Sequence, residues 1–389
     1  MNEVLSFLKD GTHGTHADDE NGPLLLSAKN IKNGKIICDE TDRRISEEEY
    51  EKIHTNFSLE VGDVLLTIVG SIGETAILKD CSSITFQRSV AFLRPNGTIT
   101  SDFLYSEIQT QKFQNELDSR KSTSAQPGIY LGDLSEVPIV FTTNLDEQTK
   151  IGDYFNNLDH LITLHQQKIT LLTKLKKAML EKMFPKKGTV IPEFRFNGFA
   201  NAWEQRKLGE LAEIVGGGTP STSVESYWDG DIDWYAPAEI GEQIYLKSSQ
   251  RKITEEGLNK SSAKVLPVGT VLFTSRAGIG KTAILLKEGC TNQGFQSIVP
   301  NKNKLDSYFI FTRSEELKRY GETVGAGSTF VEVSGKQMAN MELMMPTTMD
   351  EQQKIGEYFS NLGNLITLHQ RKIDKIKNMK KAMLDQMFI

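Results

Sequence analysis

A 39-residue string occurs twice in this chain, at residues 146–184 and again at 350–388. The two copies align without a gap, and 25 of the 39 paired positions are identical. Identity at this level is too high for chance or for shared composition, so it indicates two equivalent structural units in one chain. The sequence therefore predicts a tandem duplication with internal pseudo-two-fold symmetry.

Each copy of the repeat carries the signals of one long helix. Asn144 and Thr348 lie three residues before Glu147 and Glu351, which is the spacing of a capping box. Apolar residues then recur with a period of about 3.5, typical of a coiled coil, for roughly five heptads. The predicted seam, which we also expect to support partner docking, comprises Ile151, Phe155, Leu158, Ile162, Ile169 and Leu172, and then Ile355, Phe359, Leu362, Ile366, Ile373 and Ile376.

The two helices, expected over residues 145–185 and 349–389, should pair with each other. We expect antiparallel pairing, because a large domain separates the two copies in the chain. His165 and His369 take matched places on the seam, and we interpret them as packed register positions rather than metal ligands. A general oligomerising zipper is the alternative interpretation of the same pattern.

The segments between the helices are fainter copies of each other. At an offset of 207 residues, IGETAIL (72–78) aligns with IGKTAIL (279–285). Short apolar runs bounded by Gly, Pro and Asn are typical of strands, and they occur at 64–69, 90–94, 270–274 and 297–300. Helical patterns occupy 101–117 and 305–320. The prediction is an α+β fold, with two mixed, β-rich domains (1–144 and 186–348) joined by the antiparallel coiled coil.

Composition narrows the class of protein. The three cysteines, Cys38, Cys81 and Cys290, have no paired spacing, which indicates a reducing compartment rather than a disulfide framework or a zinc module. The first residues lack the pattern of a signal peptide, and no run reaches the ~18 apolar residues that cross a bilayer. We expect a soluble, cytoplasmic protein.

The charge distribution restricts how the chain could bind nucleic acid. Residues 1–145 hold 13 basic and 22 acidic residues, within a total net charge of −6. An acidic domain argues against non-specific binding. Binding would need local basic clusters, or a partner that supplies most phosphate contacts.

Several motifs suggest catalysis but are incomplete. GIGKT (278–282) has Ser275 where a phosphate-binding loop needs glycine, and the first copy has Glu74 in place of Lys281, so we interpret it as a turn between strands. His13 and His16 are interpreted as loop residues, because no convincing metal ligand set accompanies them. The chain has no adjacent prolines of the kind a base methyltransferase would show. The one Glu-x-Lys, at 316–318, falls on a predicted helix, so no nuclease core is indicated.

Other segments are more distinctive. The first helix ends in KKAMLEKMF (176–184), and FNGFANAWEQRKLGELAEIVGGGTP (196–220) leads into the second domain. The first domain opens with DGTHGTH (10–16), and VGTVLFTSRAGIGKTAI (268–284) spans the centre of the second. With the repeated helices, these segments resemble the specificity subunit of a type I restriction–modification system over essentially the whole chain.

The resemblance implies a non-catalytic subunit that binds double-stranded DNA. Each domain would read one half of a bipartite, asymmetric target, and the helices, on the order of 57 Å long, would set the spacing. Two methyltransferase subunits would dock on the helices, and restriction subunits would join them. S-adenosylmethionine, ATP and magnesium would belong to these partners, and this chain would hold no cofactor.

Base-reading residues are predicted from chemistry, since Arg and Lys read guanine, and Asn and Gln read adenine. In the first domain the candidates are Lys29, Asn30, Lys32, Arg43, Arg44, Gln87, Arg88, Ser122, Thr123 and Gln126. In the second they are Arg276, Lys281, Asn292, Gln293, Gln296, Ser328, Thr329 and Lys336.

The first domain departs from the second at its start. Residues 194–208 precede the second domain, whereas Met1 aligns with Leu208 at the offset of 207. Either the true start lies upstream, or the chain is naturally short there. In the second case we expect the first domain to lack an edge element that would pack near the C-terminal helix. Together with the acidic balance, this departure supports the alternative function of a scaffold or anti-restriction mimic that does not bind DNA.

Overall fold

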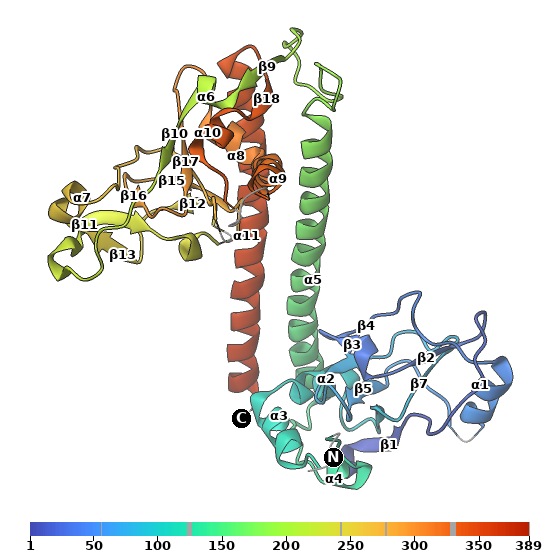
Figure 1. The fold of residues 1–389 in the computed structure, drawn as a ribbon. Helices are drawn as coiled ribbons and strands as arrows, with labels where there is room; N and C mark the ends of the chain where they lie inside the picture. The colour runs from blue at the N-terminus through green and yellow to red at the C-terminus, as the bar shows by residue number, and fades with distance from the viewer. Residues whose placement is uncertain (56, 123–126, 242, 277, 327–331, 389) are drawn as a thin grey trace. The chain divides into compact units, whose positions relative to one another are not determined.

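The computed structural model describes residues 1–55, 57–122, 127–241, 243–276, 278–326 and 332–388 (Figure 1). The chain divides into two compact units. Unit 1 comprises Met1–Lys168 together with His369–Ile389, and unit 2 comprises Ile169–Leu368. Each unit therefore contains one globular part and a portion of both long helices. In the described part of the chain, no helix is long and apolar enough to span a lipid bilayer.

Unit 1 is built on a four-stranded sheet in the order β1-β8-β5-β6, with antiparallel pairing throughout. Its strands are β1 (Leu5–Asp10), β5 (Val64–Thr67), β6 (Thr75–Ile77) and β8 (Val90–Pro95). Smaller elements are β2 (Leu24–Leu26) with β7 (Ile84–Phe86), β3 (Ile31–Lys32) with β4 (Lys35–Ile36), and the helices α1 (Glu47–His54), α2 (Ser101–Ile108), α3 (Gln111–Ser119) and α4 (Leu131–Ser135).

Strand β5 has a continuously apolar sequence because both of its faces are buried. Val64 and Leu66 face a core that includes the helices, while Leu65 faces a second core on the opposite side of the sheet. A strand that is buried on both faces has a continuous run of apolar residues. A strand with one solvent-facing side instead alternates apolar and polar residues. The predicted strands at 64–69 and 90–94 are confirmed as β5 and β8.

Unit 2 holds a five-stranded sheet in the order β10-β17-β14-β15-β12 and a three-stranded sheet, β13-β11-β16. The strands are β9 (Glu204–Lys207), β10 (Ala212–Gly216), β11 (Trp228–Tyr235), β12 (Tyr245–Leu246), β13 (Arg251–Ile253), β14 (Val271–Phe273), β15 (Thr282–Leu285), β16 (Cys290–Thr291), β17 (Gln296–Pro300) and β18 (Glu342–Met345). The helices are α6 (Leu208–Leu211), α7 (Glu255–Asn259), α8 (Ser307–Thr312), α9 (Ser314–Gly325) and α10 (Gly335–Ala339). Strands β9 and β18 form a separate antiparallel pair.

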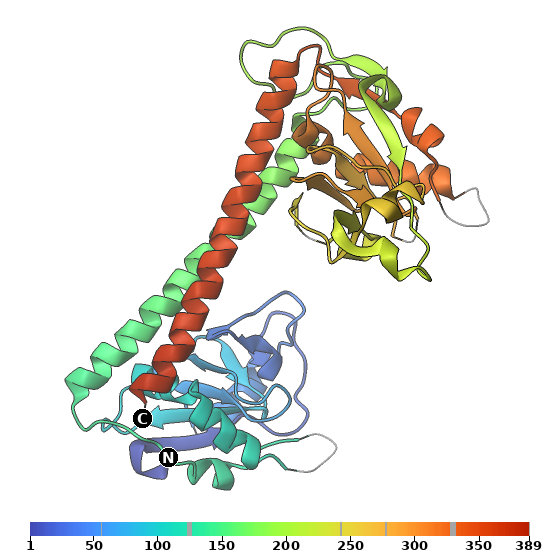
Figure 2. The ribbon, with the colours of Figure 1, turned by 90° about the vertical axis from the view of Figure 1, so that its left-hand side faces the viewer.

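The long helices are α5 (Leu145–Lys182) and α11 (Met349–Met387), so both end slightly earlier than predicted. In unit 1 they run antiparallel (Figure 2). Phe155 of α5 packs on Phe388, the residue after the end of α11, with ring centroids 6.0 Å apart, and His165 packs on His369 at 5.0 Å. In unit 2 the final turn of the first helical copy meets the start of the second, with Phe184 lying 6.3 Å from Phe359. The predicted antiparallel pairing is confirmed.

The start of α5 is docked on its own globular part by side chains of the repeat. Gln148 is fully buried; its Oε1 accepts the Thr100 amide (2.8 Å) and its Nε2 donates to the Thr98 carbonyl (2.9 Å). Gly152 lies so close to α2 that a Cβ there would sit 2.6 Å from the Cβ of Asp102. The helix therefore needs glycine at this crossing.

Unit 2 repeats this arrangement at equivalent positions. The Oε1 of Gln352 accepts the Asp306 amide (3.1 Å), and its Nε2 donates to the Lys304 carbonyl (3.0 Å). A Cβ at Gly356 would approach the Asp306 carboxylate to 2.8 Å. The repeated string thus encodes domain docking as well as helix pairing.

The seam residues have the predicted internal role. Phe155, Leu158, Ile162, Leu172, Ile355, Phe359, Leu362 and Ile373 are buried, and Ile151, Ile169, Ile366 and Ile376 are partly buried. Because the eight buried side chains pack within the chain, they are not available to a partner protein, and the expectation that they also serve partner docking is wrong. For the four partly buried residues this role stays a prediction.

Two local predictions need correction. The capping boxes are half formed: Asn144 and Thr348 accept the amides of Glu147 and Glu351, but neither carboxylate turns back to its cap. Glu147 accepts the hydroxyl of Thr142, and Glu351 binds Arg195.

The helix expected over 101–117 is two helices, because the Thr110 hydroxyl caps a new helix start by accepting the Phe113 amide. Similarly, 305–320 is divided between α8 and α9.

Phe155→Ala should lower the free energy of unfolding by about 3–5 kcal/mol, because it removes a fully buried ring shared by α2, α5 and α11. The matched control is Leu161→Ala on the same helix, where the side chain is exposed and the change should stay within ~0.5 kcal/mol. Urea unfolding followed by circular dichroism measures both. Equal losses for the two variants would contradict the assigned seam.

The histidine pair predicts a pH dependence. The Nδ1 atoms of His165 and His369 lie 2.9 Å apart, and the pKa of His369 is lowered by desolvation and then by the charges of His165, Lys372 and Lys168. The unfolded chain therefore takes up a proton first as the pH falls below ~6.5, so the stability from this pair is lost in acid. The stability difference between wild type and His369→Gln should shrink from pH 7.5 to 5.5. A difference that grew would contradict this sign.

Candidate nucleic-acid interface

The segment that resembles a phosphate-binding loop is a hairpin turn. Between β14 and β15, the Thr274 hydroxyl accepts the Lys281 amide (2.9 Å), and the Gly280 amide donates to the Thr274 carbonyl (3.0 Å). In unit 1, Thr67 makes the same two bonds with Glu74 and Gly73, at 2.9 and 3.0 Å. In both units a threonine bonds to two amides of the turn and so closes it. This confirms the interpretation of GIGKT (278–282) as a turn that connects two strands.

Four loops meet in unit 2, and we call their common surface the loop face of unit 2. The Gly218 amide donates to the Thr291 carbonyl (2.8 Å), the Ser275 amide to Gly294 (2.7 Å), and the Val333 amide to Ser275 (3.0 Å). The loop face is therefore formed by the segments around 218–219, 274–276, 291–296 and 332–336. It carries the predicted residues Arg276, Asn292, Gln293, Gln296 and Lys336.

Contacts on this face hold some of the candidate side chains. The Arg276 Nε lies 2.9 Å from a carboxylate oxygen of Glu332. The Gln293 Oε1 accepts the Thr219 hydroxyl, and the Asn292 Oδ1 accepts the Gly294 amide at 2.8 Å. Arg276 and Gln293 are nevertheless exposed, so both can present polar atoms to a ligand. A charged and an amide side chain side by side suit recognition of base edges.

The loop face of unit 1 is built by equivalent loops. The Thr12 amide donates to the Phe86 carbonyl (2.8 Å), and the Arg88 amide donates to Thr12 (3.0 Å). The Ile129 amide donates to Ile68 (2.9 Å), at the positions equivalent to Val333 and Ser275. Gln87, Arg88 and Ser122 lie on this face, and the Arg88 side chain is exposed.

The other described candidates in unit 1 are Lys29, Asn30, Lys32, Arg43 and Arg44. Asn30 is buried, and its amide group is used by the Ser27 amide, the Ile37 carbonyl and Asp42. It stabilises a turn, so its prediction as a base reader is wrong.

Basic candidates near this turn are largely engaged. Lys29 lies 2.8 Å from Asp42, and this bond holds the pKa of the Asp42 carboxyl down at about 2. Arg43 donates to Asp18 (2.5 Å), and Arg44 donates to the Gly22 carbonyl (2.8 Å). Carboxylates of unit 1 therefore pair with some of its own basic side chains. Lys32 is exposed in the β3–β4 hairpin, and Lys281 is exposed at the end of its turn. Thr123, Gln126, Ser328 and Thr329 lie outside the described residues.

His13 and His16 have local partners, as their interpretation as loop residues requires. The His13 Nε2 lies 2.8 Å from Asp10, and the His16 Nδ1 lies 2.8 Å from Glu49. Across the part of the chain that the structure describes, no group of three or more His, Cys, Asp or Glu side chains is placed to hold a metal ion.

Sequence reasoning missed an aromatic cluster in unit 2. The Arg251 guanidinium lies 3.7 Å from the centre of the Trp228 ring, and Trp228 meets Trp234 edge to face at 5.1 Å. Both tryptophan rings are buried, at 8% and 5% exposure, so this cluster is part of the core of unit 2 rather than a free stacking surface. The spacing of the two tryptophans, six residues apart, was the available signal.

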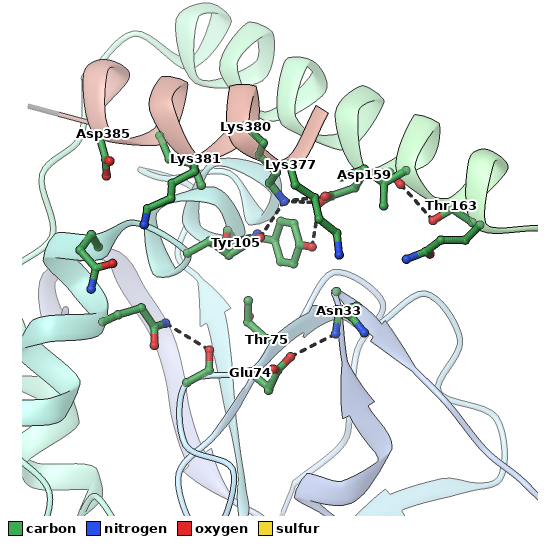
Figure 3. A pocket seen from close by; sticks show the side chains of 18 of the residues that line it. Asn33, Glu74, Thr75, Tyr105, Asp159, Thr163, Lys377, Lys380, Lys381 and Asp385 are labelled. Carbon is green, nitrogen blue, oxygen red and sulfur yellow. Dashed lines mark hydrogen bonds and ion pairs between the residues drawn. The ribbon is translucent and has the colours of Figure 1, made fainter. Parts of the chain in front are cut away.

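A pocket of about 520 Å³ in unit 1 was also not foreseen (Figure 3). Its walls include Lys377 and Lys381 of α11 on one side, and Asn33 and Glu74 on the other. No signal in the sequence places these residues together, because their meeting depends on the antiparallel pairing of α11 with α5.

An ion pair with two further partners lies in this pocket. Lys380 donates to both oxygens of Asp159 (2.5 and 2.7 Å) and to Gln109 (2.7 Å), while the Tyr105 hydroxyl donates to Asp159 at 3.0 Å. Burial, followed by the Asp159 charge, raises the pKa of Tyr105 far above its usual range. The network ties α2, α5 and α11 together. In unit 2 the position equivalent to Asp159 is Gly363, so that unit lacks this ion pair.

The family model of the type I restriction modification DNA specificity domain matches the chain twice, at residues 17–174 and 201–378. These matches cover most of the sequence, one on each copy of the duplication. The chain belongs to this family.

Two specificity subunits of Methanocaldococcus jannaschii illustrate the relationship. The chain is 33% identical over 190 residues to that of type I restriction enzyme MjaIX, covering 48% of this chain and 44% of the relative. It is 24% identical over 397 residues to the putative MjaX specificity subunit, covering 99% of this chain and 91% of the relative. In the first match the chain thus spans less than half of its relative's length.

A solved structure has the same fold. The crystal structure of the type I restriction–modification S subunit from M. genitalium superposes with a TM-score of 0.65 and 14% identity, covering 100% of this chain and 94% of that one. At this identity the likeness establishes the fold, and the α+β prediction with two repeats is confirmed.

Asp159→Asn should lower the free energy of unfolding by about 1–3 kcal/mol, because it leaves the buried Lys380 ammonium without its charged partner. Asp153→Asn removes the same charge at an exposed position of α5 and should change little, within ~0.5 kcal/mol. Thermal unfolding of both variants at one pH tests the difference. A similar effect from the two substitutions would rule out a structural role for the ion pair.

Proposed function

We propose that this chain is the DNA-sequence-specificity subunit of a type I restriction–modification complex and recognises a bipartite, asymmetric target. The observation that carries the proposal is the duplication: one chain holds two copies of the family's specificity domain, each with its own loop face. Two recognition surfaces in one polypeptide suit a target with two separate parts.

The loop faces carry different sets of polar side chains. The face of unit 1 offers Gln87 and Arg88, while that of unit 2 offers Asn292, Gln293 and Arg276. Both sets combine an arginine, which suits guanine, with amide side chains, which suit adenine, in the major groove. The different number of these side chains in the two units supports an asymmetric target.

The chain acts without catalysing a reaction itself. The glycine-rich turn at 278–282 uses Thr274 to close a hairpin, which leaves no phosphate cradle of its own. S-adenosylmethionine, ATP and magnesium belong to the methyltransferase and restriction subunits. These partners also supply phosphate contacts that the acidic unit 1 does not.

The long helices dock two methyltransferase subunits through their outer faces. Leu161 and Leu164 of α5 are exposed, and so are Leu365 and Leu368 of α11, at the positions equivalent by the repeat. Each of these four leucines has 42–46% of its surface exposed. This is more exposed apolar surface than we expect on helix faces that contact only water. Two equivalent apolar patches, one in each unit, suit two copies of one partner.

The helices also act as a spacer between the half-sites. Continuous helices of 38 and 39 residues would each be roughly 57 Å long at 1.5 Å per residue. This length exceeds one ~34 Å turn of B-DNA, so half-site centres about one turn apart or somewhat more are expected.

Methylome sequencing tests the function. A host strain that expresses this chain with its cognate methyltransferase should acquire methylated adenines in a two-part motif with a fixed gap. A strain without the chain should lack them. A complex that assembles but modifies no DNA would instead favour the non-binding scaffold, for which the acidic charge of residues 1–145 is the supporting observation.

Arg88→Ala should relax specificity at one position of one half-site and leave the other half unchanged, because the exposed guanidinium lies on the loop face of unit 1. Methylome sequencing of the variant reads out both half-sites together. The control is Lys52→Ala, an exposed residue of α1 already paired with Glu48 and Glu49. A uniform loss of methylation at all sequences would make Arg88 a phosphate contact.

A further inference from the structure

Unit 1 contains a cleft between its globular part and its long helices. The pocket of about 520 Å³ that Lys377 and Lys381 border adjoins a second pocket of about 730 Å³. The two pockets share five lining residues, which are Asn33, Gly34, Tyr105, Asp159 and Thr163. Small ligands typically occupy pockets of roughly 300–1,000 Å³. We call the two pockets together the side cleft of unit 1.

Unit 2 has a cavity at the equivalent place, beside the turn between β14 and β15. Gly278–Lys281 line a volume of about 530 Å³ there, and they align with residues 71–74, of which 72–74 line the side cleft. Among the described residues that line this cavity of unit 2, none belongs to α5 or α11. A cavity at the turn is therefore a feature of the duplicated fold, whereas the wall that carries lysines is specific to unit 1.

One end of the side cleft is cationic. Lys377 and Lys381 lie one turn apart on α11 and point into the cleft from the helix side (Figure 3). Both are exposed, and neither forms an ion pair with a described residue. Lys380, between them, is already held by Asp159 and Gln109. Two free ammonium groups at this spacing suit a ligand with two adjacent phosphates.

The middle of the side cleft is polar and firmly held. The Tyr105 hydroxyl donates to Asp159, and Gly34 lies so close to Tyr105 that a Cβ at this glycine would overlap the hydroxyl. The Oε2 atom of Glu74 accepts the Asn33 amide at 3.1 Å, and its Oε1 atom has no hydrogen-bond partner among the described residues. A carboxylate with a free oxygen can accept the hydroxyl groups of a ribose, as acidic side chains do in dinucleotide-binding folds.

The far end of the side cleft is apolar. Ile36 of β4, Ile77 of β6 and Ile84 of β7 line only the second pocket, and each is partly exposed. Lys35 and Asn157 also line this end, and both are exposed. Aliphatic side chains with a few polar groups beside them are the surroundings in which proteins bind a planar heterocycle.

The charges of the walls restrict the ligand further. Asp159 is neutralised by Lys380, so the free carboxylates are those of Glu74, Asp80 and Asp385, against the four lysines Lys35, Lys79, Lys377 and Lys381. Asp385 lies one turn beyond Lys381 and thus farther from Lys377. A ligand with one compact anionic group suits this distribution better than a chain of many phosphates.

We propose that the side cleft binds a nucleoside diphosphate, with its phosphates on Lys377 and Lys381, its ribose at Glu74 and its base beside the three isoleucines. The order of cationic, acceptor and apolar surfaces along the cleft is the order of these three parts in the ligand. The nucleotide is held by the specificity subunit itself and is separate from the S-adenosylmethionine and ATP that the partner subunits use.

Isothermal titration calorimetry of the full-length chain with ADP tests the proposal. ADP should bind with a dissociation constant in the micromolar range. Lys377→Ala combined with Lys381→Ala should weaken binding about tenfold or more, because it removes both charges that bind the phosphates. The matched control is Lys372→Ala combined with Lys375→Ala, which removes two exposed charges of α11 that do not line the cleft. This control should bind within about twofold of wild type, because solvent and salt screen such charges.

Three related ligands separate the parts of the site. Adenosine and pyrophosphate should each bind about tenfold or more weakly than ADP, because each fills only one end of the cleft. 2′-Deoxy-ADP should bind about fivefold more weakly than ADP, since it leaves the Glu74 carboxylate without its hydroxyl partner. Glu74→Gln should reduce this difference to within about twofold. Thermal unfolding of each variant without ligand verifies that it is folded.

Four outcomes would overturn the proposal. One is the absence of saturable binding up to about 1 mM ADP. Another is equal weakening by the two double lysine variants. The third is binding of pyrophosphate as tightly as ADP, which would indicate an anion site only. The fourth is displacement of ADP by duplex DNA that the Lys377→Ala and Lys381→Ala variant binds more weakly at all sequences alike, since this would assign the lysines to DNA phosphates. The proposal does not depend on DNA recognition, so its failure leaves the proposed function untouched.

Discussion

The docking of each long helix on the globular part that precedes it is the constraint on which the rest of the structure depends. One face of α5 carries Gln148, which bonds to the turn before α2, and Gly152, which lets the two helices touch. One turn further, Phe155 enters the core. A buried amide that satisfies three backbone groups fixes the helix direction more strictly than apolar packing alone. The same geometry recurs in α11, so each loop face has a defined relation to its own helix start.

The sequence was most informative where one physical requirement acts on many residues. The period of about 3.5 and the 25 identical positions were sufficient to predict long helices and antiparallel pairing. Strands such as β5 were found because burial on both faces demands an apolar run. The break between α2 and α3 was missed, since Thr110 caps a helix through one hydroxyl that any threonine could offer. The repeated Gln and Gly were seen only as identities, because their partners lie some 50 residues away.

The candidate interface was predicted less well. Residue type alone selected Arg88 and Arg276, which lie on the loop faces, and equally Asn30, which is buried beneath a turn. Type describes what a side chain can bind, whereas exposure and existing partners decide whether it is available. Lys29 and Arg43 illustrate this limit, since each is held by a neighbouring carboxylate. The cluster of Arg251 on Trp228 depends on the pairing of β11 with β13, which no local pattern specifies.

The division of the long helices between the two units bears on how the chain folds during synthesis. Unit 2 is one continuous stretch, Ile169–Leu368, whereas unit 1 needs both the first 168 residues and the last 21. Phe155 and Leu158 pack with Leu384 and Phe388, which are synthesised after all of unit 2. At about 5–20 residues per second, roughly 10–45 s separate the synthesis of these partners. The first-made domain thus completes its core only after the whole of unit 2 has been synthesised.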